Sequence, residues 1–390
     1  MSIVKFLYTH CKETLHFYKR IKLYLVDSYR FKFLAQIMPY DTQQLNSLTI
    51  DNSTIMSSYI KFLSRNKLYT VIEAIGLIVS IAFVILIGNY VYQQYSVAYG
   101  NPDGNRIYAV GNKDYISLSW WDKAVFEAEL PEAEAVCRIS NADDAGYITI
   151  GDEHINATVT EADPELFELF PNLTLMDGNM DEFRLKGHCL VSESLAQRAF
   201  NGDSIGKPVT ITFFDDKNES MVCGVFKDDD YSMIPYTDVI LNPEFDELYE
   251  PENQVPFSSI GSYMTLIKVH EGTDREEFAK KIEAVGLPHY SGSFVSAMPI
   301  YTLPEVFFTE NQWMFKKGNK SLLQILTVVV LLLLLSAVFN YINLNMALSG
   351  KRAKEMATRR LHGATQGRII LKYIVESVSF TAVCFVLAFW

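Results

Sequence analysis

The sequence lacks the motifs on which most nucleotide-dependent and metal-dependent enzymes rely. It has no phosphate-binding loop of the form G-x-x-x-x-G-K-[ST], and the nearest run, KKGNKS at 316–321, has no first glycine. Its seven histidines show neither H-E-x-x-H nor another paired metal spacing. No Ser/His/Asp or Cys/His order stands out either. We therefore expect no catalytic, cofactor-binding or metal-binding residue, and no enzymatic activity in this chain.

Cysteine is scarce, with five residues in the chain. Cys137, Cys189 and Cys223 lie in the long polar region between the two apolar runs described below. Cys189 and Cys223 fall in expected strands and could form a disulfide if those strands are neighbours. Buried free thiols are the alternative, and we favour them because three is an odd number.

Charge is missing from two long stretches. Residues 74–102 and residues 321–350 contain no Asp, Glu, Lys or Arg over 29 and 30 positions. About 20 apolar helical residues suffice to cross the hydrocarbon core of a membrane. The first run begins about 70 residues into the chain and is too long for a cleaved signal peptide. The sequence therefore predicts a membrane protein and excludes an ordinary soluble one.

A third apolar segment, residues 377–390, closes the printed sequence. Fourteen helical residues rise about 21 Å, which is short of the roughly 30 Å hydrocarbon core. We therefore expect a truncated third span, in a protein whose full sequence continues beyond Trp390 with further apolar segments.

Charge also sets the expected orientation. Residues 96–318 hold 16 Lys and Arg against 39 Asp and Glu, a net charge of −23. Residues 349–372 hold seven Lys and Arg against one Glu, a net charge of +6. Basic residues close to span ends stay in the cytoplasm, whereas long domains translocate largely regardless of charge. The region 96–318 is therefore expected outside, between spans 1 and 2, and the basic loop inside.

Residues 1–55 mix aromatic and basic residues and then become polar. They are either an amphipathic helix on the inner leaflet or an extension that results from a mis-called start. We favour a natural start at Met56, because MSSYIKFLSRNKLYTVIEAIG reads as a complete basic-then-apolar start of a membrane span.

The region 96–318 alternates short strands and helices, which predicts an α+β domain. Thr273 and Glu276 form an expected capping box for a helix that ends at Gly286. A second helix is expected over 192–200. The segments VTITFF and SMVCGVF, with DDKNE between them, predict a hairpin.

The run SGKRAKEMATRRLHGA, residues 349–364, holds five Lys or Arg and one Glu. It could be a nucleic-acid arm, a membrane-surface anchor or a cytoplasmic loop that docks a partner. Its place after the second span explains its charge, so we expect no nucleic-acid partner. A loop that only sets the topology remains an alternative. A helix is expected from Gly350 to His362, ending at Gly363. Its apolar residues are Ala353, Met356, Ala357 and Leu361.

Polar residues in the spans point to packing between helices. Asn340 and Asn343 lie three residues apart on one helix face, and an amide in lipid needs an internal partner. Glu376 follows Lys372 by four residues, which allows an ion pair on one face of the third helix.

The segment FNYINLNMALSGKRAKEMATRRLHGATQGRIILKYIVES resembles the signature of the FtsX-like permease family, the membrane half of MacB- and LolC-type ABC transporters. Its matches are Asn340 to Leu344, Ser349, Arg352, Lys354, Glu355, Arg359, Arg360, Gly363, Ala364 and Glu376. The outer region resembles the MacB-like periplasmic core domain in LFELFP, Gly178, VSESLAQRAF, IGKPV and CGVFKD. The resemblance covers residues 56–390.

The resemblance implies a permease of four spans, with the large domain between the first and second spans. It implies a multi-pass protein of the bacterial inner membrane, a separate cytoplasmic ABC ATPase, a second permease half or a homodimer partner, and membrane lipid around the spans. A periplasmic or outer-membrane partner could also take part. The expected coupling residues are Lys351, Arg352, Lys354, Glu355, Met356, Arg359, Arg360, Leu361, His362 and Gly363. The transmembrane packing residues are Asn340, Asn343 and Glu376.

These inferences divide the chain into six parts. They are an extension (1–55), a cytoplasmic segment with the first transmembrane helix (56–95), the periplasmic core domain (96–318), the second transmembrane helix (319–348), the coupling helix and loop (349–368), and the start of the third transmembrane helix (369–390).

The expected function is that of a truncated permease subunit, which transmits nucleotide-driven movement of the ATPase to the periplasmic domain and exports or extracts an envelope substrate. Two alternatives remain: a regulator of a periplasmic cell-wall hydrolase, and a membrane-anchored sensor. Thr358 and His362 stand where apolar residues would be expected, which leaves the docking face of the basic helix open.

Overall fold

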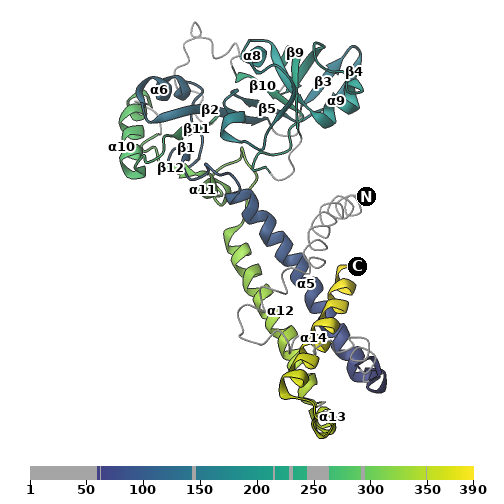
Figure 1. Ribbon diagram of the computed structural model, residues 1–390. Coiled ribbons are helices and arrows are strands. Elements are labelled where there is room, and N and C mark those ends of the chain that lie inside the picture. The colour runs from purple at the N-terminus through teal and green to yellow at the C-terminus, as the bar shows by residue number, and fades with distance from the viewer. Residues whose placement is uncertain are drawn as a thin grey trace, which may run out of the picture. The chain divides into compact units, whose positions relative to one another are not determined.

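The computed structural model describes residues 59–61, 63–142, 146–213, 216–227, 232–243, 263–290, 295–347 and 349–390 (Figure 1). The expectation for residues 1–55 lies outside this part of the chain. The described residues form a polar α+β domain and a set of long apolar helices that precede and follow it in the sequence.

Among the described residues, three helices are long and apolar enough to cross a membrane. They are α5 (Lys67–Tyr99), α12 (Lys320–Ala347, with the candidate span Lys320–Asn343) and α14 (Gln366–Phe389). In α5 and α12 apolar residues surround the helix on all sides instead of forming one stripe, which is typical of a helix that is surrounded by lipid. The short helix α13 (Ser349–Leu361) lies between α12 and α14 in the sequence.

Helix α14 corrects the expected length of the third apolar segment. It has 24 residues, which rise about 36 Å, whereas the uncharged segment from which we estimated the length of the span has 14 residues and rises about 21 Å. The expectation was wrong because it stopped at the charged residues. Lys372 and Glu376 lie within the helix and neutralise each other at 3.1 Å, so the helix continues through them.

The domain between α5 and α12 contains one mixed sheet with the order β12-β1-β11-β2-β5-β10-β7-β9-β8-β3-β4, and β6 pairs with β9. The pairs β5–β10 and β7–β9 are parallel, and the other pairs are antiparallel. The strands are β1 (Ile107–Val110), β2 (Ala133–Ala142), β3 (Tyr147–Ile150), β4 (Glu153–Asn156), β5 (Val159–Ala162), β6 (Leu175–Gly178), β7 (His188–Ser192), β8 (Pro208–Phe213), β9 (Asp216–Phe226), β10 (Val239–Leu241), β11 (Met264–Val269) and β12 (Ile300–Thr302).

In the described part of this domain, six short helices and one 3-10 helix join the strands. They are α6 (Asp122–Glu129), α7 (Leu166–Leu169), α8 (Met180–Phe183), α9 (Glu193–Phe200), α10 (Arg275–Gly286), the 3-10 helix η4 (Leu287–Tyr290) and α11 (Leu303–Phe307). Phe126 of α6 and Phe278 of α10 are buried in one cluster against strands at the β1 end of the sheet. Leu195 of α9 is buried in another cluster, against β7 and β9. The α+β class predicted from the sequence is confirmed.

Local details confirm some predictions and correct others. Helix α9 follows β7 directly, as expected, with the Ser192 hydroxyl accepting a hydrogen bond from the Leu195 amide. The cap of α10 is Asp274 instead of Thr273, because the carboxylate of Asp274 reaches the amides of both Glu276 and Glu277.

The expected hairpin of β8 and β9 forms, but its turn is shorter than DDKNE. Strand β9 already begins at Asp216, and Lys217 to Glu219 pair with Thr210 to Thr212. These polar residues stay in the ladder because antiparallel pairing satisfies their backbone groups. Strands β7 and β9 are neighbours, yet Cys189 and Cys223 are buried free thiols.

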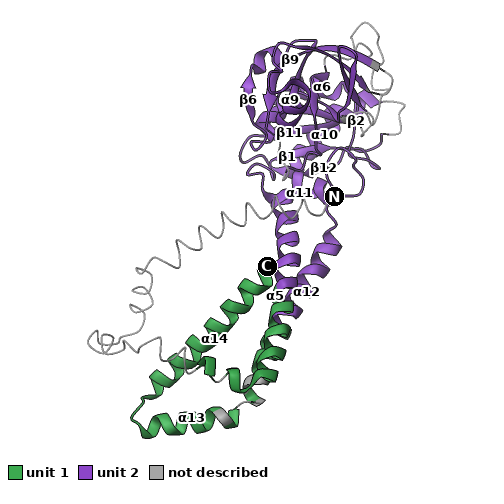
Figure 2. Cartoon of the chain, turned by 90° about the vertical axis from the view of Figure 1, so that its right-hand side faces the viewer, with its two compact units in different colours: residues 1–81, 336–390 green, residues 82–335 purple. Residues whose placement is uncertain are grey.

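The chain divides into two compact units, which Figure 2 shows in different colours. One contains residues 1–81 and 336–390, and hence the described N-terminal part of α5, the C-terminal part of α12, and all of α13 and α14. The other contains residues 82–335, and hence the α+β domain with the adjoining turns of α5 and α12.

Candidate functional site

The basic helix α13 has a well-defined C-terminal end. The amide of Ala364 donates to the carbonyl of Arg359, and the amide of Gly363 donates to that of Arg360, each at 3.0 Å. Gly363 has a φ of 84°, a left-handed conformation that glycine adopts without steric cost. This Schellman motif satisfies two of the last helical carbonyls. The expected helix end at Gly363 is confirmed.

Helix α13 presents two different faces. Arg352, Glu355, Met356 and Arg359 are partly buried, at a spacing of three or four residues. The opposite face is exposed and contains Ala353, Lys354, Ala357, Thr358, Arg360, Leu361 and His362. Leu361 is 86% exposed. The side chain of Lys351 lies outside the described part of the chain.

The partly buried face of α13 contacts α14 through charged groups. Glu355 accepts hydrogen bonds from Lys372 of α14 and from Arg359, the latter at 3.0 Å. Partial burial alone would raise the pKa of Glu355, but the ammonium of Lys372 and the guanidinium of Arg359 hold it below its ordinary value. Arg352 places its guanidinium 5.0 Å from the centre of the Tyr373 ring, a cation–π contact.

Of the two expected packing amides, one lies against a neighbouring helix. Asn340 of α12 donates a long hydrogen bond of 3.5 Å to the Glu73 carbonyl of α5. Its side chain also lies against Gly76, where a Cβ atom would come within 2.8 Å of the Asn340 amide nitrogen. The side chain of Asn343 is exposed. Asn340 therefore marks the close approach of α5 and α12.

Apolar and polar contacts also join α14 to the other long helices. Leu77 of α5, Ala337 of α12, and Phe380 and Cys384 of α14 form one buried cluster. Next to it, the hydroxyl groups of Tyr341 and Ser377 form a hydrogen bond between α12 and α14. The three long helices are thus packed together in the unit that contains α13.

In the other unit, the last turns of α5 are anchored to the α+β domain. Ala98 is buried, and the Asn101 side chain donates to the Leu169 carbonyl at 2.7 Å. Tyr95 and Tyr99 both contact the ring of Phe308, with centroid distances of 6.4 and 6.3 Å.

The segment before α12 is anchored in the same unit. The Lys316 amide donates to the Met233 carbonyl at 2.9 Å, and the Gly318 amide donates to the Phe307 carbonyl at 2.8 Å. The Phe315 ring is buried against Phe170. The segments at the end of α5 and before α12 are therefore both anchored to the domain.

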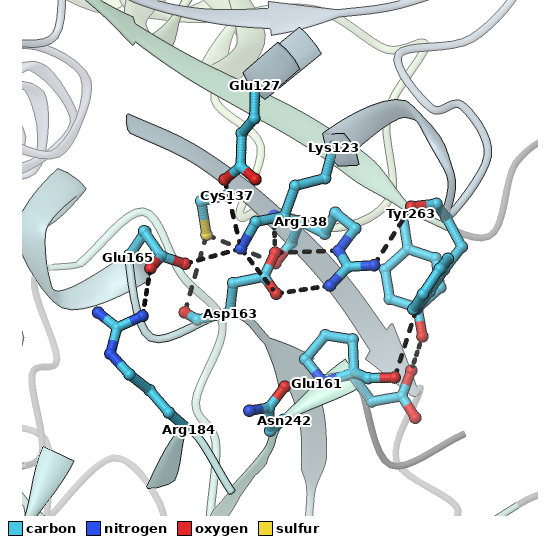
Figure 3. A network of polar contacts seen from close by, with 12 residues as sticks. Lys123, Glu127, Cys137, Arg138, Glu161, Asp163, Glu165, Arg184, Asn242 and Tyr263 are labelled. Atoms are coloured by element: carbon cyan, nitrogen blue, oxygen red, sulfur yellow. Dashed lines mark hydrogen bonds and ion pairs between the residues drawn. The ribbon is translucent and has the colours of Figure 1, made fainter. Parts of the chain in front are cut away.

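A buried ion-pair network lies inside this domain (Figure 3). The Arg138 guanidinium of β2 binds the Asp163 carboxylate through two oxygens, at 2.8 and 3.0 Å, and stacks on Trp120 at 4.3 Å. Arg138 and Asp163 are 2% and 1% exposed. Burial would raise the pKa of Asp163, but Arg138 and Lys123 hold it below its ordinary value.

The network links four parts of the domain. Lys123 of α6 lies 3.2 Å from Asp163 and 2.9 Å from Glu165, and Glu165 pairs with Arg184 after α8 at 2.7 Å. Figure 3 shows Asp163 between Arg138 and Lys123. The network therefore connects α6 and β2 with the segments around α7 and α8.

These residues were not predicted from the sequence. The available signal was one arginine in the strand AEAVCRISNA, at a position that shares a face with the buried Val136. A buried arginine needs a carboxylate partner, but nothing local identifies Asp163, which lies 25 positions away.

An α+β domain between two long apolar helices, followed by a short basic helix and a third apolar helix, is the architecture of a membrane protein that carries a folded polar domain. Two family models match the chain. The MacB-like periplasmic core domain matches residues 70–285, which is more than half of the chain, and the FtsX-like permease C-terminal domain matches residues 327–389. The chain therefore belongs to the FtsX-like, MacB-type family of ABC transporter permeases.

Solved structures of similar domains accompany these matches. A permease-protein domain from Porphyromonas gingivalis is 19% identical, with a TM-score of 0.44, and the match covers 57% of this chain and 98% of that one. The periplasmic region of MacB from Actinobacillus actinomycetemcomitans is 15% identical, with a TM-score of 0.37 and coverages of 52% and 91%. The extracellular domain of YknZ, a noncanonic ABC-type transporter from Gram-positive bacteria, is 12% identical, with a TM-score of 0.35 and coverages of 50% and 100%. The comparison with curated proteins gave no match.

Proposed function

We propose that this chain is a permease subunit that couples a separate cytoplasmic ABC ATPase to movement of its periplasmic domain, for export or extraction of an envelope substrate. The observation that carries the proposal is α13, a short basic helix between two apolar helices whose outer face is exposed. Members of this family generally act with an ATPase. A second permease half or a second copy of this chain would complete the membrane part.

The proposed topology places residues 96–318 in the periplasm of a multi-pass inner-membrane protein, between α5 and α12. The net charge of −23 in this region against +6 in residues 349–372 supports it. Single cysteines at the exposed positions 271 and 357, in a chain without native cysteines, test it. We expect a membrane-impermeant maleimide to label position 271 in intact spheroplasts and position 357 only after the inner membrane is permeabilised. The opposite pattern would exclude the topology.

The proposed ATPase contact is the exposed face of α13. Ala353, Ala357 and Leu361 recur at four-residue intervals and form an apolar strip, flanked by Lys354 and Arg360. Such a strip fits an apolar groove with an acidic rim, the usual way in which an amphipathic helix docks.

A photocrosslinking residue at position 357 tests this contact in native membranes. We expect it to capture a protein with the nucleotide-binding motifs of an ABC ATPase, whereas the same residue at Ile374 on α14 should capture lipid or permease helices. If position 357 captures no ATPase while the protein is correctly inserted, α13 is only a topology determinant.

The proposed transmission path runs from α13 through the long helices to the domain. The buried cluster of α5, α12 and α14 and the anchors at Asn101 and Phe315 support it. Helices α5 and α12 are each continuous, and each has residues in both compact units, so they are the elements proposed to carry the displacement. The substrate class proposed is a molecule of the cell envelope.

A further inference from the structure

The charges between α13 and α14 form a line of alternating sign. Arg359, Glu355, Lys372 and Glu376 follow one another, with distances of 3.0 Å between Arg359 and Glu355 and 3.1 Å between Lys372 and Glu376. The two outer pairs each lie within one helix. Only the ion pair of Glu355 with Lys372 joins α13 to α14 in this line.

Burial makes this ion pair costly to break. The side chains of Lys372 and Glu376 are each 5% exposed, and that of Glu355 is 31% exposed. A buried ammonium that loses a partner retains its desolvation cost without the full compensation. If α13 moves, Lys372 is therefore expected to move with Glu355, and α14 with it.

A second contact, between Arg352 and Tyr373, also joins α13 to α14. The Arg352 guanidinium stacks on Tyr373, next to Lys372, so that Arg352 and Glu355, one turn apart on α13, meet the same turn of α14. Arg352, Glu355 and Arg359 lie on the partly buried face, whereas Ala357 and Leu361 lie on the exposed face. The residues that hold α14 are thus separate from those available to a partner.

Helix α14 contacts both of the other long helices, α5 and α12. Ser377, one residue after Glu376, bonds Tyr341 of α12, and Phe380 and Cys384 pack with Leu77 of α5. A displacement of the inner end of α14 would therefore reach α5 and α12.

We propose that Glu355 is a positioning residue that clamps the basic helix α13 to the inner end of α14, so that force on α13 enters the membrane helices through α14. The clamp itself follows from the geometry of the chain. Its role in transmission rests on the proposed ATPase coupling.

The clamp can be tested in the chain alone. Spin labels at the exposed positions 357 on α13 and 374 on α14, in the full chain in nanodiscs and without native cysteines, report the distance between the helices. We expect one narrow distance distribution for the parent chain and for Arg360→Gln, which removes a charge from the exposed face. Glu355→Gln should broaden or shift the distribution, although Lys372 keeps Glu376 as a partner. A Glu355→Gln distribution identical to the parent overturns the clamp.

The transmission role is tested with the ATPase that position 357 captures. Glu355→Gln should bind this ATPase within about twofold of the parent chain but lower its stimulated turnover about tenfold, which corresponds to about 1.4 kcal/mol in activation free energy. In a Glu355→Cys/Lys372→Cys chain, a flexible bis-thiosulfonate crosslink should raise the turnover again. Loss of binding in Glu355→Gln, or turnover that stays low after crosslinking, contradicts the transmission role.

These outcomes separate the two proposals. If Leu361→Asp, on the exposed face, leaves ATPase binding unchanged, the proposed docking fails, and the spin-label distances still decide whether the clamp exists. If Leu361→Asp abolishes binding but Glu355→Gln changes neither distance nor turnover, the docking stands and the clamp is excluded.

Discussion

At the residue scale, the pair of Arg138 with Asp163 shows how the periplasmic-type domain stabilises charges in its interior. Each group is almost fully buried, and the two are joined by two side-chain hydrogen bonds and by a backbone bond of 2.6 Å from the Arg138 amide. Burying such ions is expensive, so the pair contributes stability only while both partners remain.

Replacing Arg138 by Met is therefore expected to destabilise the domain by about 3 kcal/mol, because Asp163 would lose both guanidinium bonds and keep only Lys123 and the backbone amide at position 138. The matched change Arg184→Met removes an ion pair whose arginine is 53% exposed, and should cost less than about 1 kcal/mol. Denaturant unfolding followed by tryptophan fluorescence measures both values, since Trp120 lies under Arg138. Equal effects of the two substitutions would contradict this account.

The pKa of Asp122 is raised, whereas that of Asp163 is lowered. The two carboxyl groups therefore change the stability of the domain with pH in opposite directions. Burial raises the pKa of its carboxyl group to about 7, although Tyr290 and the Ser119 amide donate hydrogen bonds to it. The folded domain thus holds a proton that the unfolded chain releases near pH 4. Stability from this group is present below pH 4 and is lost as the pH rises through 7, by about 1.4 kcal/mol per pH unit.

Asp122→Asn should abolish this loss. We expect the thermal midpoint of the variant to rise relative to that of the parent chain between pH 4 and pH 8, with the largest difference at pH 8. The comparison with the parent removes the contribution of other carboxyl groups. A constant difference between the two proteins across this range would show that Asp122 titrates normally.

Residues such as these define the limit of sequence reasoning. The spacing of Lys372 and Glu376 was enough to predict their pairing, because four residues along a helix place two side chains on one face. Tertiary packing alone brings Arg138 next to Asp163, and Glu355 next to Lys372, because the partners lie on separate elements. No local sequence pattern predicts these two pairs.

At the element scale, helices were predicted better than their caps and lengths. The end of α13 at Gly363 could be read from the sequence because a glycine in the left-handed conformation is a local requirement. The cap of α10 could not, because Thr273 and Asp274 are both good capping residues and the geometry of the loop decides between them. Likewise, the exposed face of α13 could not be predicted from the sequence, because the packing of α14 against α13 decides which face is covered.

Gly318 offers a test of how α12 is joined to the domain. A Cβ atom at this position would overlap the ring of Phe307, which is buried in the core. Gly318→Ala should therefore displace Phe307 and destabilise the junction by about 1–3 kcal/mol. Gly88→Ala in α5 is the control, because a Cβ atom there meets no atom within 4 Å. Hydrogen exchange of α11 should speed up in the first variant alone, and unchanged exchange would show that the junction adapts.

At the scale of the whole molecule, the class of protein could be predicted from the sequence, because it depends on the composition of long segments. Two uncharged stretches and a large contrast in charge predicted apolar helices with an acidic region between them, and the family matches at residues 70–285 and 327–389 agree with that reading. The substrate could not be predicted in this way, because it depends on the shape and chemistry of surfaces, which composition and charge do not specify.

In the proposed function, the exposed face of α13 transmits the action of an ATPase to the permease. The most direct measurement is the ATP turnover of the partner ATPase, reconstituted with the full chain in proteoliposomes. Leu361→Asp places a charge in the proposed contact, where an unpaired charge can cost several kcal/mol, and should lower the stimulated turnover by about tenfold or more. Leu185→Asp, which makes the same change at a residue of the α+β domain that is 56% exposed, should leave it unchanged. Full stimulation by the Leu361→Asp chain would contradict the account.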